Sequence, residues 1–307
     1  MPSTFFFRNL KSDDPATAPM HHFRCGVVYF SAGLWWYSAL HFGGSVQHVP
    51  LNNPDSAALK AWILAIFGDD APTESDYRPG TAYKRIALPL NTSGTLRKAT
   101  NSAAMTQSFV ALKILLAKMH EVFETVEPSQ SNRHVFGHRI RELLLLAAME
   151  VEASWAAVLR ANGYTGDRWN TKDYVKLLKP MLLDSFTLKL RSYPDFPPIT
   201  PFMGWSGQSP TKSLPWYSAY NHTKHNREQY LPAATFECAV QAVSAAAVMF
   251  YAQFGYRFET GDEMRPVIGN VFALNIDHSM YPISCYIPNA ENGPRAWEWE
   301  LLNFPFA

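Results

Sequence analysis

The feature that most restricts the fold of this 307-residue chain is a long helical pattern that is apolar on every side in its middle turns. The pattern runs from about His138 to Leu159, and its Leu143–Met149 segment contains no polar residue. A helix that is hydrophobic all round has to be covered by neighbouring elements. Asn162-Gly163 supplies a stop signal just beyond it. The sequence therefore predicts the central helix of a bundle.

Further helical patterns lie on either side of this helix in the sequence. Before it, apolar residues recur at three-to-four spacing and stop ahead of Glu127-Pro128; they are Phe109, Leu112, Leu115, Leu116 and Met119. After it, three more helices are predicted, over Thr171–Leu178, Leu214–Glu228 and Pro232–Gln253. Pro232 suits the first turn of the last helix, and Gly255 suits its end.

The two ends of the chain show the patterns of short strands. Residues 1–100 contain strand-like runs at Gly26–Phe30 and Lys84–Leu90 and one short helical pattern at Asp55–Phe67. Residues 257–307 contain strand-like runs at Val271–Ile276, Ile283–Ile287 and Trp297–Leu301. We therefore predict a mainly α protein. A helical bundle would occupy residues 101–256, with a mixed α/β region at 1–100 and a short β-rich tail at 257–307 packed on the core.

The composition excludes several classes of protein. Charged residues make up 17% of the chain and aromatic residues 14%, a balance that excludes a disordered chain. The formal net charge is +1, so binding to nucleic acid or to an anionic membrane would require a local basic patch. The three cysteines, Cys25, Cys238 and Cys285, form no CxxC pair. Reduced thiols in a cytoplasmic protein are the simplest interpretation.

Neither a membrane segment nor a metal site is predicted. No Asp, Glu, Lys or Arg occurs from Cys25 to Pro54, but several glycines and serines interrupt this run. We interpret it as a buried strand or helix, since a spanning helix needs about 20 predominantly apolar residues. His21-His22 has no further ligand at a fixed spacing, and neither a phosphate-binding glycine loop nor an HExxH motif occurs. We expect no metal and no cofactor.

Mixed polar chemistry concentrates in the predicted helix Leu214–Glu228. At about 100° per residue, one arc of this helix carries Tyr217, Asn221, Lys224, His225 and Glu228. Arg227 lies further round, close to Tyr220. A face with an imidazole, an ammonium, an amide and two phenols suits a phosphate-bearing ligand. We name this helix face the polar face.

The polar face would support RNA cleavage as follows. His225 would exchange a proton near neutral pH, with Asn221 orienting its imidazole. Lys224 and Arg227 would stabilise charge on a phosphoryl oxygen attacked by the 2′-hydroxyl.

Two phenols and two residues of the central helix complete the candidate site. Tyr217 and Tyr220 would stack on a base. Arg141 and Glu142 are candidate substrate contacts.

The same residues also have a structural interpretation. Lys224 and Glu228 are spaced as an ordinary i,i+4 ion pair. Carboxylates such as Glu150 and Glu152 next to an apolar run need partners when buried, and Arg141, Lys224 and Arg227 could supply them across two packed helices. The aromatic run at Trp35, Trp36 and Tyr37 likewise fits either a small-ligand pocket or an ordinary core.

The stretch from Tyr220 to Arg227, the long apolar helix 138–159 and the following helix 232–254 resemble the HEPN (higher eukaryote and prokaryote nucleotide-binding) superfamily. Active members are metal-independent ribonucleases of toxin–antitoxin or phage-defence systems, and they act as dimers; others are inactive RNA-binding or adaptor modules. The family's ribonuclease motif places an Arg before a His. That order occurs at Arg133–His138, whereas the helix at 214–228 has no Arg before His225.

Two functions follow from the residues and the resemblance. The first is a cytoplasmic protein that binds RNA or a nucleotide at the polar face, with metal-independent cleavage as the activity that the resemblance implies. Its partners would be a second copy of the chain and an antitoxin or other protein. The second is a non-catalytic interaction or adaptor protein, in which the polar face is structural or docks a partner.

Overall fold

The computed structural model describes residues 4–11, 25–31, 33–39, 47–75, 81–86, 102–166, 168–255, 264–276 and 300–306. The chain divides into two compact units. The first comprises residues 1–83, 88–99 and 278–302, and the second comprises residues 84–87, 100–277 and 303–307. The units are interleaved in sequence, since each is built from three separate segments.

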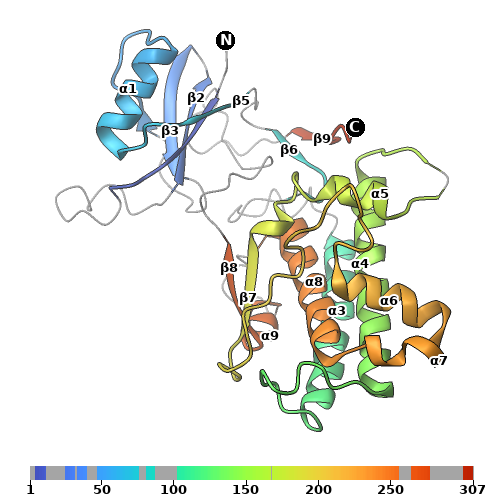
Figure 1. The fold of residues 1–307 in the computed structure, drawn as a ribbon. Helices are drawn as coiled ribbons and strands as arrows, with labels where there is room; N and C mark the ends of the chain where they lie inside the picture. Colours follow the sequence, from blue (N-terminus) through green and yellow to red (C-terminus); the bar gives the residue numbers. More distant parts are fainter. Residues whose placement is uncertain are drawn as a thin grey trace. The chain divides into compact units, whose positions relative to one another are not determined.

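The first unit contains a five-stranded antiparallel sheet (Figure 1). Its strands are β1 (Thr4–Arg8), β2 (Cys25–Ser31), β3 (Leu34–Ala39), β4 (Gln47–His48) and β5 (Thr73–Ser75), in the order β4-β3-β2-β1-β5. Val28 of β2 pairs with Phe5 on one side and Tyr37 on the other, so these three side chains share one face. A separate parallel pair joins β6 (Thr81–Tyr83) to β9 (Glu300–Leu302).

Helix α1 (Ser56–Phe67) covers one face of this sheet. Asp55 caps its start by accepting a hydrogen bond from the Ala58 amide, and Gly68 ends it in the left-handed conformation. Leu59, Ile63 and Phe67 recur at helical spacing and pack on side chains of the strands. The resulting core contains Phe5, Phe7, Val28, Val49, Leu59, Ile63 and Phe67, with Trp35, Tyr37, Leu51 and Trp62 at its edge.

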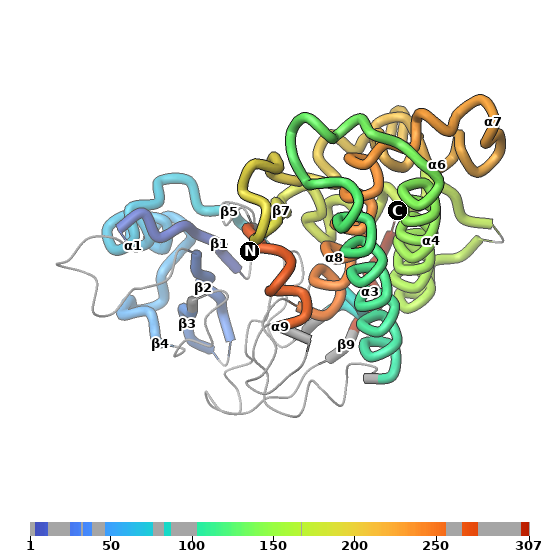
Figure 2. The backbone as a smooth tube through the Cα atoms, turned by 90° about the horizontal axis from the view of Figure 1, so that it is seen from below, coloured from blue at the N-terminus to red at the C-terminus, as the bar shows by residue number. Residues whose placement is uncertain are grey.

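The second unit is built on three long helices, α3 (Ser102–Phe123), α4 (His138–Ala161) and α8 (Phe236–Phe254), each of which contacts the other two (Figure 2). Helix α6 (Pro215–His225) packs against α4 and α8. Every residue from Ala242 to Phe254 is buried. The most completely covered helix is therefore α8, whereas α4 exposes Leu146 and Met149 from the apolar run that predicted a central helix.

Shorter elements complete the second unit. They are α5 (Thr171–Tyr174), η1 (Val175–Leu177), η2 (Leu183–Ser185), β7 (Phe186–Leu190), α7 (Arg227–Tyr230), η3 (Leu231–Ala233), α9 (Met264–Gly269) and β8 (Phe272–Ile276). Strand β7 pairs with β8 in antiparallel register, and Leu188 faces Leu274. The two-stranded sheet therefore joins the middle of the chain to its last third.

The prediction of a mainly α helical bundle is wrong, because the protein is a mixed α/β structure with a five-stranded antiparallel sheet. Strands β1, β5 and β7 were not among the predicted elements. Within the uncharged run, Cys25–Ser31 and Leu34–Ala39 are strands. Lys84 to Ile86 form a turn instead of the expected strand, while residues 87–90, 283–287 and 297–299 lie outside the described residues.

Two short segments attach to the helical unit from distant parts of the chain. The side chain of Asn162, at the end of α4, donates to the Lys84 carbonyl at 2.8 Å and accepts from the Phe304 amide at 2.7 Å. Arg85 donates from Nε to Oε1 of Gln253 at 2.8 Å, and its guanidinium lies 5.4 Å from the Phe254 ring centroid. These contacts hold residues 84–86 and 303–306 against the ends of α4 and α8.

Candidate functional site

The helix that carries the polar face ends earlier than predicted. Asn226 adopts φ −143° and ψ 85°, which terminates α6 at His225. Its side chain then accepts from the Gln229 amide and caps the short helix α7. The prediction of one helix from Leu214 to Glu228 is therefore wrong. Arg227 and Glu228 belong to a second helix, so they do not share an arc with the residues of α6.

Two phenols of the polar face point into the protein rather than toward a ligand. Tyr217 is 4% exposed and Tyr220 is 0% exposed. Both donate to the carboxylate of Glu152 on α4: Tyr217 to Oε1, and Tyr220 to Oε2 at 3.0 Å. The two phenols therefore supply the partners that this half-buried carboxylate needs. A base cannot stack on either ring in this arrangement.

Lys224 and Asn221 are held by neighbours on their own helix. The Lys224 ammonium donates to the Tyr220 hydroxyl at 2.9 Å and lies 5.0 Å from the centroid of the same ring. The Asn221 amide donates to the Tyr217 carbonyl at 3.3 Å. Lys224, Tyr220, Glu152 and Tyr217 thus form one continuous chain of hydrogen bonds between α6 and α4, which we call the tyrosine–glutamate lock.

The lock shifts the pKa of its members. Burial, and then the hydrogen bond to Glu152, raise the pKa of Tyr217 far above its ordinary value. Burial also raises the pKa of Tyr220. The hydrogen bond to Tyr220 raises the pKa of Lys224. Both phenols are therefore neutral donors and Lys224 is a cation near neutral pH, which is the charge state of a structural network.

His225 and Arg227 are exposed. Neither side chain has a hydrogen bond or an ion pair with another part of the chain that the structure describes. The neighbouring His222 stacks on Tyr230 of α7, with ring centroids 4.9 Å apart and planes 24° from parallel. The structure therefore leaves the imidazole of His225 and the guanidinium of Arg227 accessible to solvent.

Arg141 reaches the end of α6 from α4. Its guanidinium donates to the Thr223 carbonyl at 2.9 Å, and this satisfies one of the carbonyl groups that a helix leaves unpaired in its last turn. Cations at a helix C-terminus are stabilised by the helix dipole, and His222, Lys224 and His225 occupy the same last turn. This interaction explains part of the local concentration of positive charge.

Glu142 does not join the polar face. Its carboxylate lies 3.6 Å from the Lys118 ammonium on α3, and both side chains are more than one third exposed. An exposed pair of this kind contributes little to stability. Arg141 and Glu142 are adjacent in sequence but are directed to different neighbouring helices, so the structure does not bring them together as substrate contacts.

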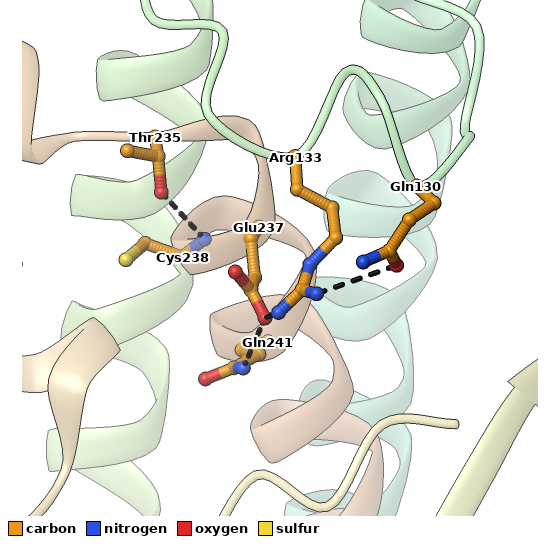
Figure 3. A network of polar contacts seen from close by, with 6 residues as sticks. All are labelled: Gln130, Arg133, Thr235, Glu237, Cys238 and Gln241. Carbon is orange, nitrogen blue, oxygen red and sulfur yellow. Dashed lines mark hydrogen bonds and ion pairs between the residues drawn. The ribbon is translucent and has the colours of Figure 1, made fainter. Parts of the chain in front are cut away.

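The two side chains of the Arg133–His138 motif also have different surroundings. The Arg133 guanidinium forms an ion pair with Glu237 in the first turn of α8 and contacts Oε1 of Gln130 at 3.3 Å, and Gln241 also donates to Glu237 (Figure 3). His138 is exposed and begins α4. Arg133 therefore fastens the α3–α4 connection to α8.

Sequence reasoning missed a second polar cluster, in which the half-buried Arg85 contacts the buried Gln253. The guanidinium lies close enough to Glu150 for the two charges to interact; burial lowers the pKa of Arg85, and burial raises the pKa of Glu150. Arg85 adopts φ 57°, a left-handed conformation that is uncommon for residues other than glycine. Local sequence patterns could not indicate this cluster, because Arg85 and Gln253 are 168 residues apart in the sequence.

The aromatic run of β3 contributes to packing. Tyr37 lies 5.3 Å from Trp62 and 5.9 Å from Phe67 between ring centroids, so α1 covers it. The indole of Trp36 donates to the Ser31 carbonyl at 3.0 Å. Trp35 and Tyr37 therefore pack at the edge of the core, as the core interpretation expects, whereas Trp36 is partly exposed and points to the other face of the strand.

Among the described residues, no helix is long and apolar enough to cross a membrane, and no cluster of three metal-ligating side chains occurs. Comparison with known proteins gives no match to a family model, to a curated protein or to a solved structure. The resemblance to the HEPN superfamily therefore rests on residues 220–227 and on the helices 138–159 and 232–254, and it remains a proposal.

Proposed function

We propose that the chain is a non-catalytic interaction protein that binds RNA phosphates at one basic surface of the helical unit. This surface, which we call the basic end, consists of the exposed residues His138 and Arg139 at the start of α4 and His222, His225 and Arg227 at the end of α6 and the start of α7. The observation that carries the proposal is the contact of Arg141 with the Thr223 carbonyl, because it brings the two helix ends side by side.

The electrostatics of the basic end support an anionic ligand. Glu142 lies within ion-pair distance of Lys118, and Glu237 is paired with Arg133, whereas the exposed Glu228 next to Arg227 has no ion pair among the described residues. Arg139 and Arg227 carry charges that no described carboxylate pairs. Protein contacts to RNA phosphates use such side chains, and the binding weakens with salt because it depends on the release of counterions.

We favour binding over cleavage because the side chains required for cleavage do not point toward one common site. The Lys224 ammonium is engaged with Tyr220, and Asn221 donates to a backbone carbonyl instead of to His225. Arg227 lies beyond the helix break at Asn226. The proposed function is therefore the adaptor type of activity that the resemblance also implies, with a second copy of the chain or an antitoxin-like protein as further proposed partners.

The proposed compartment is the cytoplasm. Among the described residues, Cys238 is a free thiol, which fits a protein in a reducing environment. RNA would be accessible in that compartment.

The test is fluorescence anisotropy with labelled single-stranded RNA over a range of salt concentrations. Removing two phosphate contacts with the double variant Arg139→Ala/Arg227→Ala should reduce the slope of log affinity against log salt by about 1.4, since each contact to a single strand contributes roughly 0.7. The matched control is Lys172→Ala/Lys189→Ala, which removes two exposed charges elsewhere in the helical unit and should leave the slope unchanged.

Incubation of the same RNA in EDTA tests the catalytic alternative. Intact RNA with wild type, together with the predicted change of slope, would support the proposal. RNA degradation that His225→Ala abolishes would favour the ribonuclease instead. Equal slopes for the two double variants would remove the basic end as the binding site.

A further inference from the structure

A pocket separate from the basic end lies between α3 and the β7–β8 sheet of the helical unit. It is lined by residues from three distant segments: the last turns of α3, the end of β7 with the turn that follows it, and the turn between α9 and β8. Its volume is about 210 Å³. The pocket belongs to one unit, so its shape does not depend on the placement of the other.

The floor of the pocket is apolar and buried. It is formed by Leu116, Met119, Phe123 and Leu190, which are all less than 9% exposed. Phe123 and Tyr193 meet edge to face, with centroids 5.3 Å apart and planes at 78°. The two aromatic rings favour an aromatic ligand over an aliphatic one, because rings make specific edge-to-face and stacked contacts with a further ring.

The mouth of the pocket carries polar groups. His120, Ser192 and Asn270 are exposed side chains on three different segments, and all three line the opening. Among the described residues, none of these side chains takes part in a hydrogen bond. An apolar floor with a few convergent polar groups at its rim is the usual form of a small-molecule site.

The volume restricts the size of the ligand. An apolar cavity of roughly 150 Å³ accommodates benzene, so the pocket leaves room for one ring and a small substituent. Pockets for drug-sized ligands span roughly 300–1,000 Å³, which places a nucleotide outside the range of this pocket. We propose that the pocket binds a single-ring aromatic molecule with one hydrogen-bonding substituent, of the phenol class, with the ring against Phe123 and Tyr193 and the substituent at Asn270 or Ser192.

The test uses p-cresol as the probe and 4-methylcyclohexanol, which has the same hydroxyl but no aromatic ring, as the control compound. Saturation-transfer NMR with the full chain should detect p-cresol at low-millimolar concentration and should detect the control much more weakly. Ser192→Trp places an indole at the mouth without altering the floor, and it should weaken p-cresol binding at least ten-fold. Ser131→Trp, at an exposed position on the α3–α4 connection, is the matched control and should have no effect.

A second variant keeps the proposal falsifiable if Ser192→Trp fails to fold. Asn270→Ala should weaken p-cresol binding roughly five-fold, as expected for one ordinary hydrogen bond. Absence of binding by wild type, equal binding of the two compounds, or equal binding by Ser192→Trp and Ser131→Trp would each overturn the proposal. The Arg139→Ala/Arg227→Ala variant should bind p-cresol as wild type does, so p-cresol binding and RNA binding are tested independently.

Discussion

At the scale of single residues, the direction of each side chain determines which members of the polar face are accessible to a ligand. Helical spacing placed Tyr217, Asn221, Lys224 and His225 on one arc. In the structure, burial against α4 divides them, because the phenols bind Glu152 while His225 remains in solvent. Sequence alone predicted that carboxylates on α4 need partners when buried, and it offered the cations Arg141, Lys224 and Arg227. It could not predict that phenols supply them, since donors of several types fit the same spacing.

Tyr217→Phe should destabilise the helical unit by about 1.5–3 kcal/mol near neutral pH, because it removes a buried hydrogen bond to a charged group. Urea denaturation followed by tryptophan fluorescence measures this change. Tyr230→Phe is the control: it removes a hydroxyl from a half-buried ring and should change the free energy of unfolding by less than about 0.5 kcal/mol. Equal effects of the two variants would contradict the lock.

The same hydroxyl makes stability depend on alkaline pH. The folded state raises the pKa of Tyr217, so its contribution is fully present below the unfolded value of about 10 and is lost as pH rises toward the folded value. Between about pH 10 and 12, wild type should lose more stability than Tyr217→Phe. Parallel pH curves for the two proteins would show that Tyr217 is not the group responsible.

At the scale of helices and strands, the strongest sequence signals were local ones. The helical pattern predicted at Asp55–Phe67 is confirmed as α1, and the residues that define its ends, the Asp55 cap and the Gly68 stop, lie next to it in the sequence. The break at Asn226 was missed because its side chain bonds locally to the Gln229 amide, an alternative that competes with helix continuation. Pro232 occupies the short helix η3, and Thr235 caps α8 instead.

Strand β7 shows the opposite case, because its own residues have a strand pattern but its partner lies far away in the sequence. Phe186, Leu188 and Leu190 alternate with polar residues, which is typical of a half-buried strand. Its partner β8 follows more than 80 residues later, as the pairing of Leu190 with Phe272 shows. Pairing over such a separation cannot be predicted from local patterns.

Thr235→Ala should lower the free energy of unfolding by about 1 kcal/mol, because the Thr235 hydroxyl accepts from the Cys238 amide at the start of α8. The effect should not be larger, since the amides of Phe236 and Glu237 donate to the carbonyls of Val135 and Arg133. Thr235→Ser retains the cap and should stay close to wild type. Thermal unfolding followed by circular dichroism distinguishes the variants, and a Ser variant as unstable as Ala would contradict the capping role.

At the scale of the whole molecule, the interleaving of the two units in the sequence restricts which fragments of the chain can reproduce the helical unit. The continuous fragment 100–277 contains the long helices but lacks Arg85 and Phe304. Its Gln253 side chain, 0% exposed in the intact chain, loses the donor to Oε1, and Asn162 loses the donor to Oδ1. The helical unit is therefore not equivalent to any single stretch of sequence.

Fragment 100–277 should be less stable than the helical unit in the intact chain by about 2–6 kcal/mol, the cost of two buried acceptors left without donors. Urea denaturation followed by circular dichroism at the helix band measures the difference. Arg85→Met in the intact chain removes one of the two contacts and should show roughly half of the loss. A fragment as stable as the intact unit would show that the two short segments contribute no stability.

The hydrogen bond between Asn162 and the Phe304 amide also has a consequence for synthesis on the ribosome. The two residues are 142 positions apart. At roughly 5–20 residues per second, roughly 7–30 s separate the appearance of one partner from that of the other. During that interval the end of α4 lacks its contact with residues 303–306, because these residues have not yet been synthesised. In the nascent chain, the Asn162 side chain at the end of α4 is therefore without the Phe304 amide, and this incomplete helix end is accessible to chaperones and proteases.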